Sequence, residues 1–233
     1  MTKDADLVLY GSPLSPFVRK AAAVCSEKNV DFTIEAVDVF DPPEWFREIS
    51  PMKRIPVLRD RSIATDGVDG TIADSSAICA YIERKHPEPS LYCKDAYAHA
   101  RALMVEEYVD TMLAASGGLG MFRPIFFNAM QGKEPDADKA RATWANDIPP
   151  MLAFLDKELE GKTFCCENSI SIADISITTI LMQIDLVADI DLSPWPALAA
   201  HYEAMCERPS IAGPARHAQA IVRKSLPDKI SLS

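Results

Sequence analysis

The chain has 233 residues, a length that fits one large domain or two smaller ones. Hydrophobic residues make up 48% of it and charged residues 25%, so a sizeable core can form. The formal net charge of -10 and the pI near 4.9 argue against non-specific nucleic-acid binding and against docking on an anionic membrane.

The sequence also argues against membrane insertion and export. Its apolar runs are shorter than the ~18 residues that suggest a transmembrane helix. The first residues carry acids where a secretory signal has a basic region. We therefore expect a cytoplasmic protein whose six cysteines are reduced thiols. Only Cys165 and Cys166 are close in sequence, and the CxxC spacing is absent, so we expect no metal site.

The first part of the chain mixes strand and helix signals. The pattern predicts, in chain order, a strand at 6–11, a helix at 16–29, a strand at 30–39, a short helix at 42–50, strands at 54–60 and 70–74, and a helix at 75–86. Pro56 makes the 54–60 segment an edge strand unless the proline has a special role. A parallel first β-α-β unit followed by a hairpin is the order of a thioredoxin-like domain.

The rest of the chain reads as helical after a polar, proline-containing linker. We expect a thioredoxin-like domain at 1–87, a linker at 88–96, and an all-α helical bundle domain at 97–233. Apolar residues recur at helical spacing, and we assign these stripes to the core: Met104, Tyr108, Met112, Ala115; Ile148, Met151, Leu152, Leu155, Leu159; Ile177, Ile180, Leu181, Ile184, Val187; Leu198, Tyr202, Met205. Ser171 and Asp174 predict a capping box, which we interpret as a folding device.

Five stretches, in the right order, resemble the glutathione transferase family. They are 9–24, 50–58, 72–87, 168–177 and 195–211. Within the family, residues 15–20 look most like those of serine-type bacterial or plant transferases. The resemblance implies a glutathione site on the first domain, an electrophile site between the domains, and a homodimer.

Ser15 is the candidate catalytic residue. Glutathione attacks as a thiolate, and a free thiol with a pKa of ~8.5 is only slightly ionised at neutral pH. A hydroxyl that donates to sulfur and a helix N-terminus both favour the anion. Ser15 precedes Pro16 at the expected helix start, and in the family the residue before Pro-Phe contacts sulfur. Ser12 is the alternative residue for the contact with sulfur. The structural alternative for Ser15 is a helix cap with no catalytic role. Serine in place of cysteine favours conjugation, elimination or isomerisation over redox exchange.

The resemblance also places the rest of the glutathione site. A cis bond before Pro56 would turn the Ile55 amide and carbonyl towards the cysteinyl part of glutathione. Asp74 and Ser75, at a helix start, would bind the glutamyl ammonium and carboxylate. Arg54 would pair with the glycyl carboxylate. The structural alternatives are an edge proline, a second helix cap and a solvated basic residue.

Two departures from the family pattern concern this site. The hairpin at 59–70 is several residues longer than is usual in the family, which would shift Asp74 or change the dimer contact. Aspartate also stands at position 74 where glutamate is commoner, so its reach is shorter.

The electrophile pocket is expected along the first long helix and its following loop. Glycines in 117–120 give room there, Tyr108, Met121 and Phe122 give apolar surface, and Arg123 would attract an anionic group. The alternative is that the phenylalanines are core. We therefore expect a glutathione transferase with a role in detoxification that acts on a small, mostly apolar electrophile. A glutathione-dependent isomerase or lyase, and a non-catalytic binding or regulatory protein of the same fold, are the alternatives.

Overall fold

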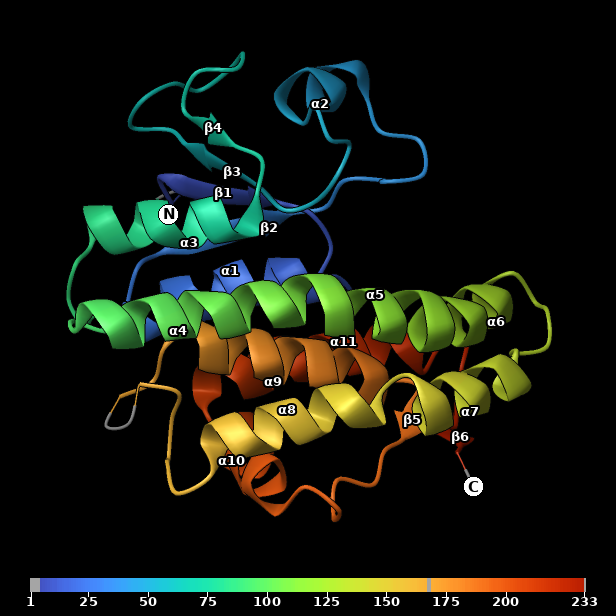
Figure 1. Ribbon diagram of the computed structural model, residues 1–233. Helices are drawn as coiled ribbons and strands as arrows, with labels where there is room; N and C mark the ends of the chain where they lie inside the picture. The colour runs from blue at the N-terminus through green and yellow to red at the C-terminus, as the bar shows by residue number, and fades with distance from the viewer. Residues whose placement is uncertain (1–4, 167–168, 233) are drawn as a thin grey trace. The chain divides into compact units, whose positions relative to one another are not determined.

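The computed structural model describes residues 5–166 and 169–232 and divides into two compact units, Met1–Ser90 and Leu91–Ser233 (Figure 1). The first unit is thioredoxin-like, with a mixed four-stranded sheet, and the second is helical. The predicted fold class is therefore confirmed. The finer division, with a linker at 88–96, stays a prediction.

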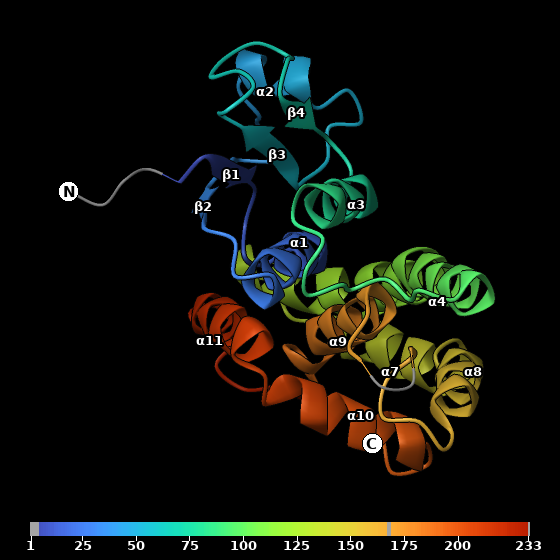
Figure 2. The same ribbon diagram turned by 90° about the vertical axis from the view of Figure 1, so that its left-hand side faces the viewer.

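The first unit has the predicted order of strands and helices. Its elements are β1 (Leu7–Tyr10), α1 (Pro16–Glu27), β2 (Phe32–Glu35), α2 (Glu44–Ile49), β3 (Val57–Asp60), β4 (Thr71–Ile72) and α3 (Ser75–Lys85). The sheet order is β2-β1-β3-β4; β1 and β2 are parallel, and β3 is antiparallel to both β1 and β4. Helices α1 and α3 cover one face and α2 lies on the other (Figures 1 and 2). All four residues of β1 are buried, which explains its unbroken apolar sequence.

The edge-strand alternative for Pro56 is excluded, and the special role expected for this proline, a cis bond after Ile55, is present. Strand β3 lies inside the sheet, between β1 and β4. The strand begins at Val57, so the proline stands just before the ladder and its missing N–H removes no bond from it.

The long hairpin between β3 and β4 is held by a buried arginine. The Arg59 side chain is 3% exposed, and its guanidinium donates to the carbonyls of Asp66 (3.1 Å), Gly67 (2.6 Å) and Asp69 (2.9 Å). These bonds pair a buried charge with backbone acceptors and give the extra hairpin residues a defined conformation.

The second unit packs its helices around α9. Its elements are α4 (Ala96–Tyr108), η1 (Val109–Leu113), α5 (Ala114–Gly117), η2 (Gly118–Phe127), α6 (Asn128–Met130), α7 (Ala137–Asn146), α8 (Pro149–Leu159), α9 (Ile172–Asp185), β5 (Ala188–Asp189), α10 (Pro196–Cys206), α11 (Pro209–Val222) and β6 (Ile230–Ser231). The α9 residues from Ile172 to Ile184 are all buried. The predicted stripes on α8 and α9 are confirmed as core.

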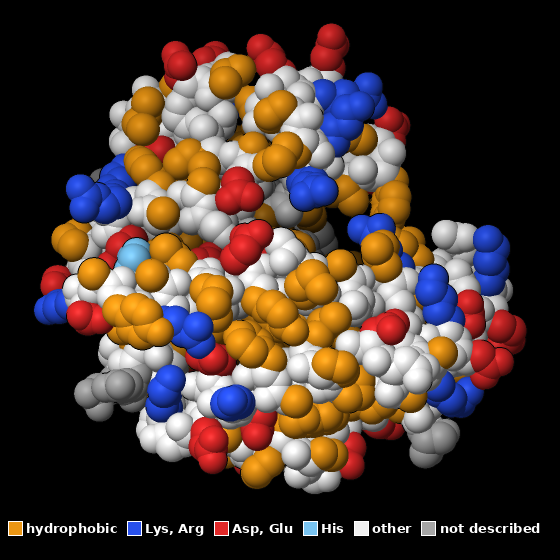
Figure 3. All heavy atoms as spheres, in the orientation of Figure 1, with side chains coloured by type: hydrophobic (Ala, Val, Ile, Leu, Met, Phe, Trp, Pro, Cys, Tyr) orange, Lys and Arg blue, Asp and Glu red, His pale blue; other side chains and the backbone are white. Residues whose placement is uncertain are grey.

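Two expectations for the first long helix are wrong. The stretch 118–127 is not a loop: it is π-helical (η2) and belongs to one helical run from Ala96 to Met130. The residues Met104 and Met112 are 39% and 51% exposed, while the buried line runs through Val105, Val109 and Leu113. Apolar residues occupy adjacent faces of this helix, so periodicity alone could not choose between them. Figure 3 shows hydrophobic side chains gathered along this exposed face.

Candidate active site

Three loops of the first unit converge at one edge of its sheet. Tyr10, the last residue of β1, pairs with Val57, the first residue of β3. The loop 11–15 that follows β1 therefore lies beside the segment that precedes β3. Ile72 pairs with Leu58, so the chain leaving β4 runs towards the same edge. The predicted site residues are distributed over these three loops.

Gly11 shows how closely two of the loops approach. A Cβ atom built at this position would lie 2.6 Å from Cγ2 of Val18 and 3.3 Å from Cβ of Ile55. A Cβ atom essentially never comes within 3.0 Å of a heavy atom to which it is not covalently linked. Glycine thus allows the loop that carries both candidate serines to pack against Ile55.

Both candidate serines are partly exposed, and each takes part in the turn that starts α1. Ser15 is the N-cap, and its Oγ accepts a hydrogen bond from the Val18 amide at 3.4 Å. Ser12 Oγ accepts from the Leu14 amide at 3.3 Å. A hydroxyl that accepts one bond still carries its own hydrogen to donate. The cap role of Ser15 and a contact with sulfur are therefore compatible.

Arg19 anchors the loop 11–15 through hydrogen bonds to its backbone. Its side chain lies in α1 and is 2% exposed, and Nη1 donates to the carbonyls of Pro13 (2.9 Å) and Leu14 (3.1 Å). Local sequence patterns do not predict which way this cation points. The structure places that charge under the segment that presents Ser12 and Ser15.

The segment before β3 has the expected cis peptide between Ile55 and Pro56. Ser50 anchors it, because its buried Oγ donates to the Arg54 carbonyl (2.8 Å) and accepts from the Arg54 amide (3.1 Å). The Arg54 side chain is exposed, so its guanidinium is accessible to an anionic ligand. Sequence reasoning missed Ser50, whose only signal is a serine four residues before Arg54.

Asp74 and Ser75 form the start of α3. Asp74 is the N-cap, and its Oδ1 accepts from the Ala77 amide at 2.9 Å, which leaves further acceptor capacity on the carboxylate. Ser75 is 9% exposed. Buried Lys20 of α1 donates to Ser76 Oγ at 3.1 Å, which ties α1 to α3 close to the α3 N-terminus. The N-termini of α1 and α3 both follow loops at this end of the sheet. Helix N-termini favour anions, so both can stabilise a negatively charged ligand.

A buried carboxylate fixes the other end of α3. Asp60, at the end of β3, is 1% exposed and accepts bonds from Tyr81 and Lys85 of α3 and from the Ser62 amide (2.9 Å). Burial works against the charge of Asp60. The bonds from Lys85, Ser62 and Tyr81 outweigh it and lower the pKa of this carboxyl to about 2.

The capping box at the start of α9 is confirmed. Asp174 is fully buried and accepts from the amides of Ser171 (2.7 Å) and Cys165 (2.8 Å), and it pairs with Nε2 of His201 at 2.8 Å. Burial disfavours its charge, but the bonds from His201, Ser171 and Cys165 lower the pKa of Asp174 below its usual value. The capping box is thus the folding device that the sequence predicted, and the bonds from His201 and Cys165, which were not predicted, extend it into a buried anchor for α9.

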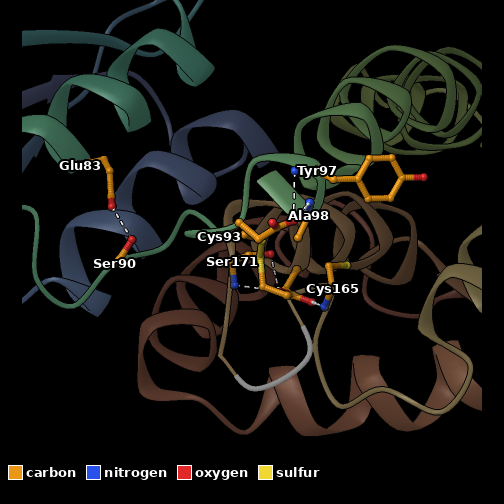
Figure 4. Close-up of a disulfide and its surroundings, with 10 residues drawn as sticks. Glu83, Ser90, Cys93, Tyr97, Ala98, Cys165 and Ser171 are labelled. Atoms are coloured by element: carbon orange, nitrogen blue, oxygen red, sulfur yellow. Dashed lines mark hydrogen bonds between the residues drawn. A yellow bond between two sulfur atoms is a disulfide. The ribbon is translucent and has the colours of Figure 1, made fainter. Parts of the chain in front are cut away.

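The expectation that all six cysteines are reduced thiols is wrong. Cys93 and Cys166 form a disulfide, with their Cα atoms 5.8 Å apart (Figure 4). Cys25 and Cys79 are buried thiols, and Cys165 and Cys206 are partly exposed thiols. The bonded cysteines are 73 residues apart, so their pairing depends on tertiary structure and not on sequence spacing.

The predicted pocket residues of the second unit divide between core and surface. Met121 and Phe122 are buried, and the Phe122 and Phe126 rings pack in a tilted arrangement with centroids 5.2 Å apart. The Tyr108 ring packs on the Phe154 ring, with their centroids 4.6 Å apart. The phenylalanine cluster is thus core, the alternative left open by the sequence.

The described residues offer neither a metal cluster nor a membrane-spanning helix. Within 5–166 and 169–232, no cluster of three or more His, Cys, Asp or Glu side chains is arranged to hold a metal ion. The helices of these same residues include none that is long and apolar enough to span a bilayer.

Comparison with known proteins identifies the family. The family described as "Glutathione S-transferase, N-terminal domain" matches residues 9–90, and "Glutathione S-transferase, C-terminal domain" matches residues 121–213. The probable glutathione S-transferase DHAR1, cytosolic, of Oryza sativa subsp. japonica is 37% identical over 176 residues, which are 75% of this chain and 68% of that protein. The chain belongs to the glutathione S-transferase family.

Two further relatives agree with this assignment. Maleylacetoacetate isomerase of Rattus norvegicus is 26% identical over 200 residues, covering 82% of this chain and 84% of that protein. A crystal structure of a glutathione S-transferase from Rhodospirillum rubrum F11 superposes with a TM-score of 0.78 at 26% identity, covering 89% of this chain and 91% of that one. The resemblance seen in the sequence is confirmed for the family, whose members use glutathione as cosubstrate. The serine-type class stays a prediction.

Proposed function

We propose that this glutathione S-transferase binds glutathione at the three converging loops and holds its sulfur as a thiolate beside Ser15. The thiolate then attacks a small, mostly apolar electrophile. The observation that carries the proposal is the placement of Ser15 at the N-cap of α1, in a loop that Gly11 brings against Ile55 and that buried Arg19 anchors.

Each end of the tripeptide has a partner in this proposal. The backbone of Ile55 pairs with the cysteinyl residue. Asp74 binds the glutamyl ammonium, and Ser75 with the α3 N-terminus binds the glutamyl carboxylate. The exposed guanidinium of Arg54 pairs with the glycyl carboxylate.

The chemical task of Ser15 is modest. Lowering the pKa of the bound thiol by about two units requires ~2.7 kcal/mol of preferential binding of the anion. A charge-assisted hydrogen bond from a hydroxyl contributes about 1.5–3 kcal/mol, and the helix N-terminus adds to it. One serine at a helix start is therefore sufficient to keep much of the bound glutathione ionised at neutral pH.

The test is a Ser15→Ala variant, with Ser12→Ala as the matched control from the same loop. The ionisation of bound glutathione is followed by the ultraviolet absorbance of the thiolate, and turnover is measured with a generic aryl halide. Ser15→Ala should raise the thiol pKa by about one unit or more and lower turnover at neutral pH by about tenfold or more. Ser12→Ala should leave both close to wild type. The assignment fails if Ser15→Ala leaves both unchanged, and it moves to Ser12 if the two variants exchange behaviour.

A second reaction is favoured by one comparison. The rat relative is named an isomerase and shares most of its length with this chain. The same thiolate can add to a double bond and leave again, so isomerisation or elimination needs no further site residue. Turnover of a double-bond isomer without loss of glutathione would select this alternative over conjugation. If the protein neither binds glutathione by calorimetry nor shows any such turnover, a non-catalytic binding role replaces both.

The homodimer and the cytoplasmic location expected from the sequence belong to the same proposal. Light scattering in solution tests the first, and fractionation of the source cells tests the second. A monomeric mass would contradict the dimer without affecting the role of Ser15.

A further inference from the structure

The helical unit contains a disulfide between two of its cysteines. Cys93 lies just before α4 and Cys166 lies in the loop before α9, and the two form a disulfide across 73 residues of sequence. Both residues are partly exposed, as exchange with a small thiol requires. Figure 4 shows the bond between the two segments that lead into these helices.

The two helix starts have anchors that do not depend on this bond. The Ile172 amide donates to the Leu91 carbonyl at 2.9 Å, which joins the two segments through the backbone. Asp95 caps α4 by accepting from the amides of Tyr97 (3.0 Å) and Ala98 (2.9 Å). The disulfide can therefore open and close while both helices keep their caps and their place in the core.

The neighbouring thiol of Cys165 does not compete for this bond. Its backbone amide is fixed on Asp174 at 2.8 Å. Burial and the negative charge of Asp174 raise the pKa of the Cys165 thiol far above neutral pH, so it stays protonated and is a poor nucleophile. Cys165 is therefore not the nucleophile that opens this bond.

We propose that Cys93 and Cys166 form a redox-active pair that glutathione opens and closes by thiol–disulfide exchange. A glutathione thiolate attacks one sulfur of the pair and forms a mixed disulfide there. The Cys93–Cys166 bond breaks, and the other cysteine leaves as a thiolate that takes a proton from water. A second glutathione thiolate attacks the glutathione sulfur of the mixed disulfide and releases oxidised glutathione and the second cysteine. Two glutathiones are oxidised and the protein disulfide is reduced by two electrons; the reverse sequence restores the bond.

Thiol–disulfide exchange at Cys93 and Cys166 requires glutathione but not Ser15. The cosubstrate of the family supplies the co-reactant, and the exchange takes place at sulfur atoms of the helical unit. Exchange is therefore expected in the Ser15→Ala variant as in the wild type, so its failure and the failure of the proposed function are distinguishable.

The experiment equilibrates the full-length native protein in mixtures of reduced and oxidised glutathione. Acid quenching, alkylation of free thiols and peptide mass mapping then report each cysteine. From the most oxidising to the most reducing mixture, the Cys93–Cys166 linked peptide should fall by about tenfold or more, with a glutathionyl group on Cys93 or Cys166 at intermediate ratios. In Cys166→Ser, Cys93 should take up one glutathionyl group from oxidised glutathione. Cys165→Ser is the matched control and should exchange as the wild type does.

Three results would overturn the proposal. The linked peptide could persist in excess reduced glutathione and open only in denaturant, which would make the bond a static cross-link. Both cysteines could stay as thiols in every mixture, which would exclude the pair. Finally, Cys165 could carry the glutathionyl group or the bond, which would place the chemistry on a different sulfur.

Discussion

Asp60 gives the sharpest test of how the first unit is held together. This carboxylate joins the end of β3 to α3, the helix whose first residues are Ser75 and Ser76, through bonds from Tyr81 and Lys85. Asp60→Asn keeps the shape of the side chain and removes its charge. The variant therefore tests the charge and not the packing.

The size of the effect follows from the pKa of Asp60. Its pKa falls from an ordinary value of 3.8 to about 2 on folding. A difference of nearly two units corresponds to about 2 kcal/mol of folding free energy. Because the folded-state pKa is the lower one, this contribution is present above pH 3.8 and is lost as the pH falls towards 2. Asp60→Asn should thus lower the free energy of unfolding by about 2 kcal/mol at pH 7, and the difference from wild type should vanish near pH 2.

Two measurements check this reasoning. Urea unfolding followed by circular dichroism at several pH values gives the difference between wild type and variant, and carboxyl NMR gives the pKa of Asp60 directly. Glu35→Gln is the matched control, because it removes the exposed ion pair with Arg61 (2.9 Å) and should change stability by less than about 1 kcal/mol. A carboxyl that titrates near 3.8, or an Asp60→Asn protein as stable as wild type at pH 7, would refute the argument.

Two further predictions concern the loops. Gly11→Ala should destabilise the protein by about 1–3 kcal/mol, because the new Cβ would lie 2.6 Å from Val18. It should also weaken glutathione binding, as measured by calorimetry. Gly118→Ala is the control: a Cβ there has no heavy atom within 4 Å, so neither stability nor binding should change. Equal affinities for glutathione in the two variants would contradict this. Arg59→Met should speed proteolysis within 61–70 by removing the donor that holds the hairpin carbonyls, while Arg61→Met should not; unchanged cleavage would show that Arg59 is not what orders the hairpin.

Sequence reasoning succeeded where short-range chemistry decides the structure. The serine before Pro16, the proline before β3 and the Ser171–Asp174 box each encode a local conformation within a few residues, and the structure shows all three. The order of strands also followed from local patterns, because each strand is short and bounded by turn residues. Convergence of the three site loops could be expected only through the family resemblance.

The misses share a physical cause. The burial of Arg19 and Arg59 was not predicted, because it depends on backbone carbonyls that accept hydrogen bonds from the two guanidinium groups only in the folded loops. The core face of α4 was misplaced because Met104 and Val105 are both apolar and only packing distinguishes them. The cross-link of Cys93 is invisible to spacing for the same reason: its partner is adjacent only after folding.

That cross-link also changes the covalent topology of the polypeptide. Between Cys93 and Cys166 the backbone closes into a ring that contains α4 through α8. A single cut in the exposed turn at 131–134 would linearise this ring without liberating a fragment, so the nicked molecule would migrate as one species on a gel until a reductant is added. Mobility after limited digestion thereby becomes a simple gauge of how much of a preparation is oxidised.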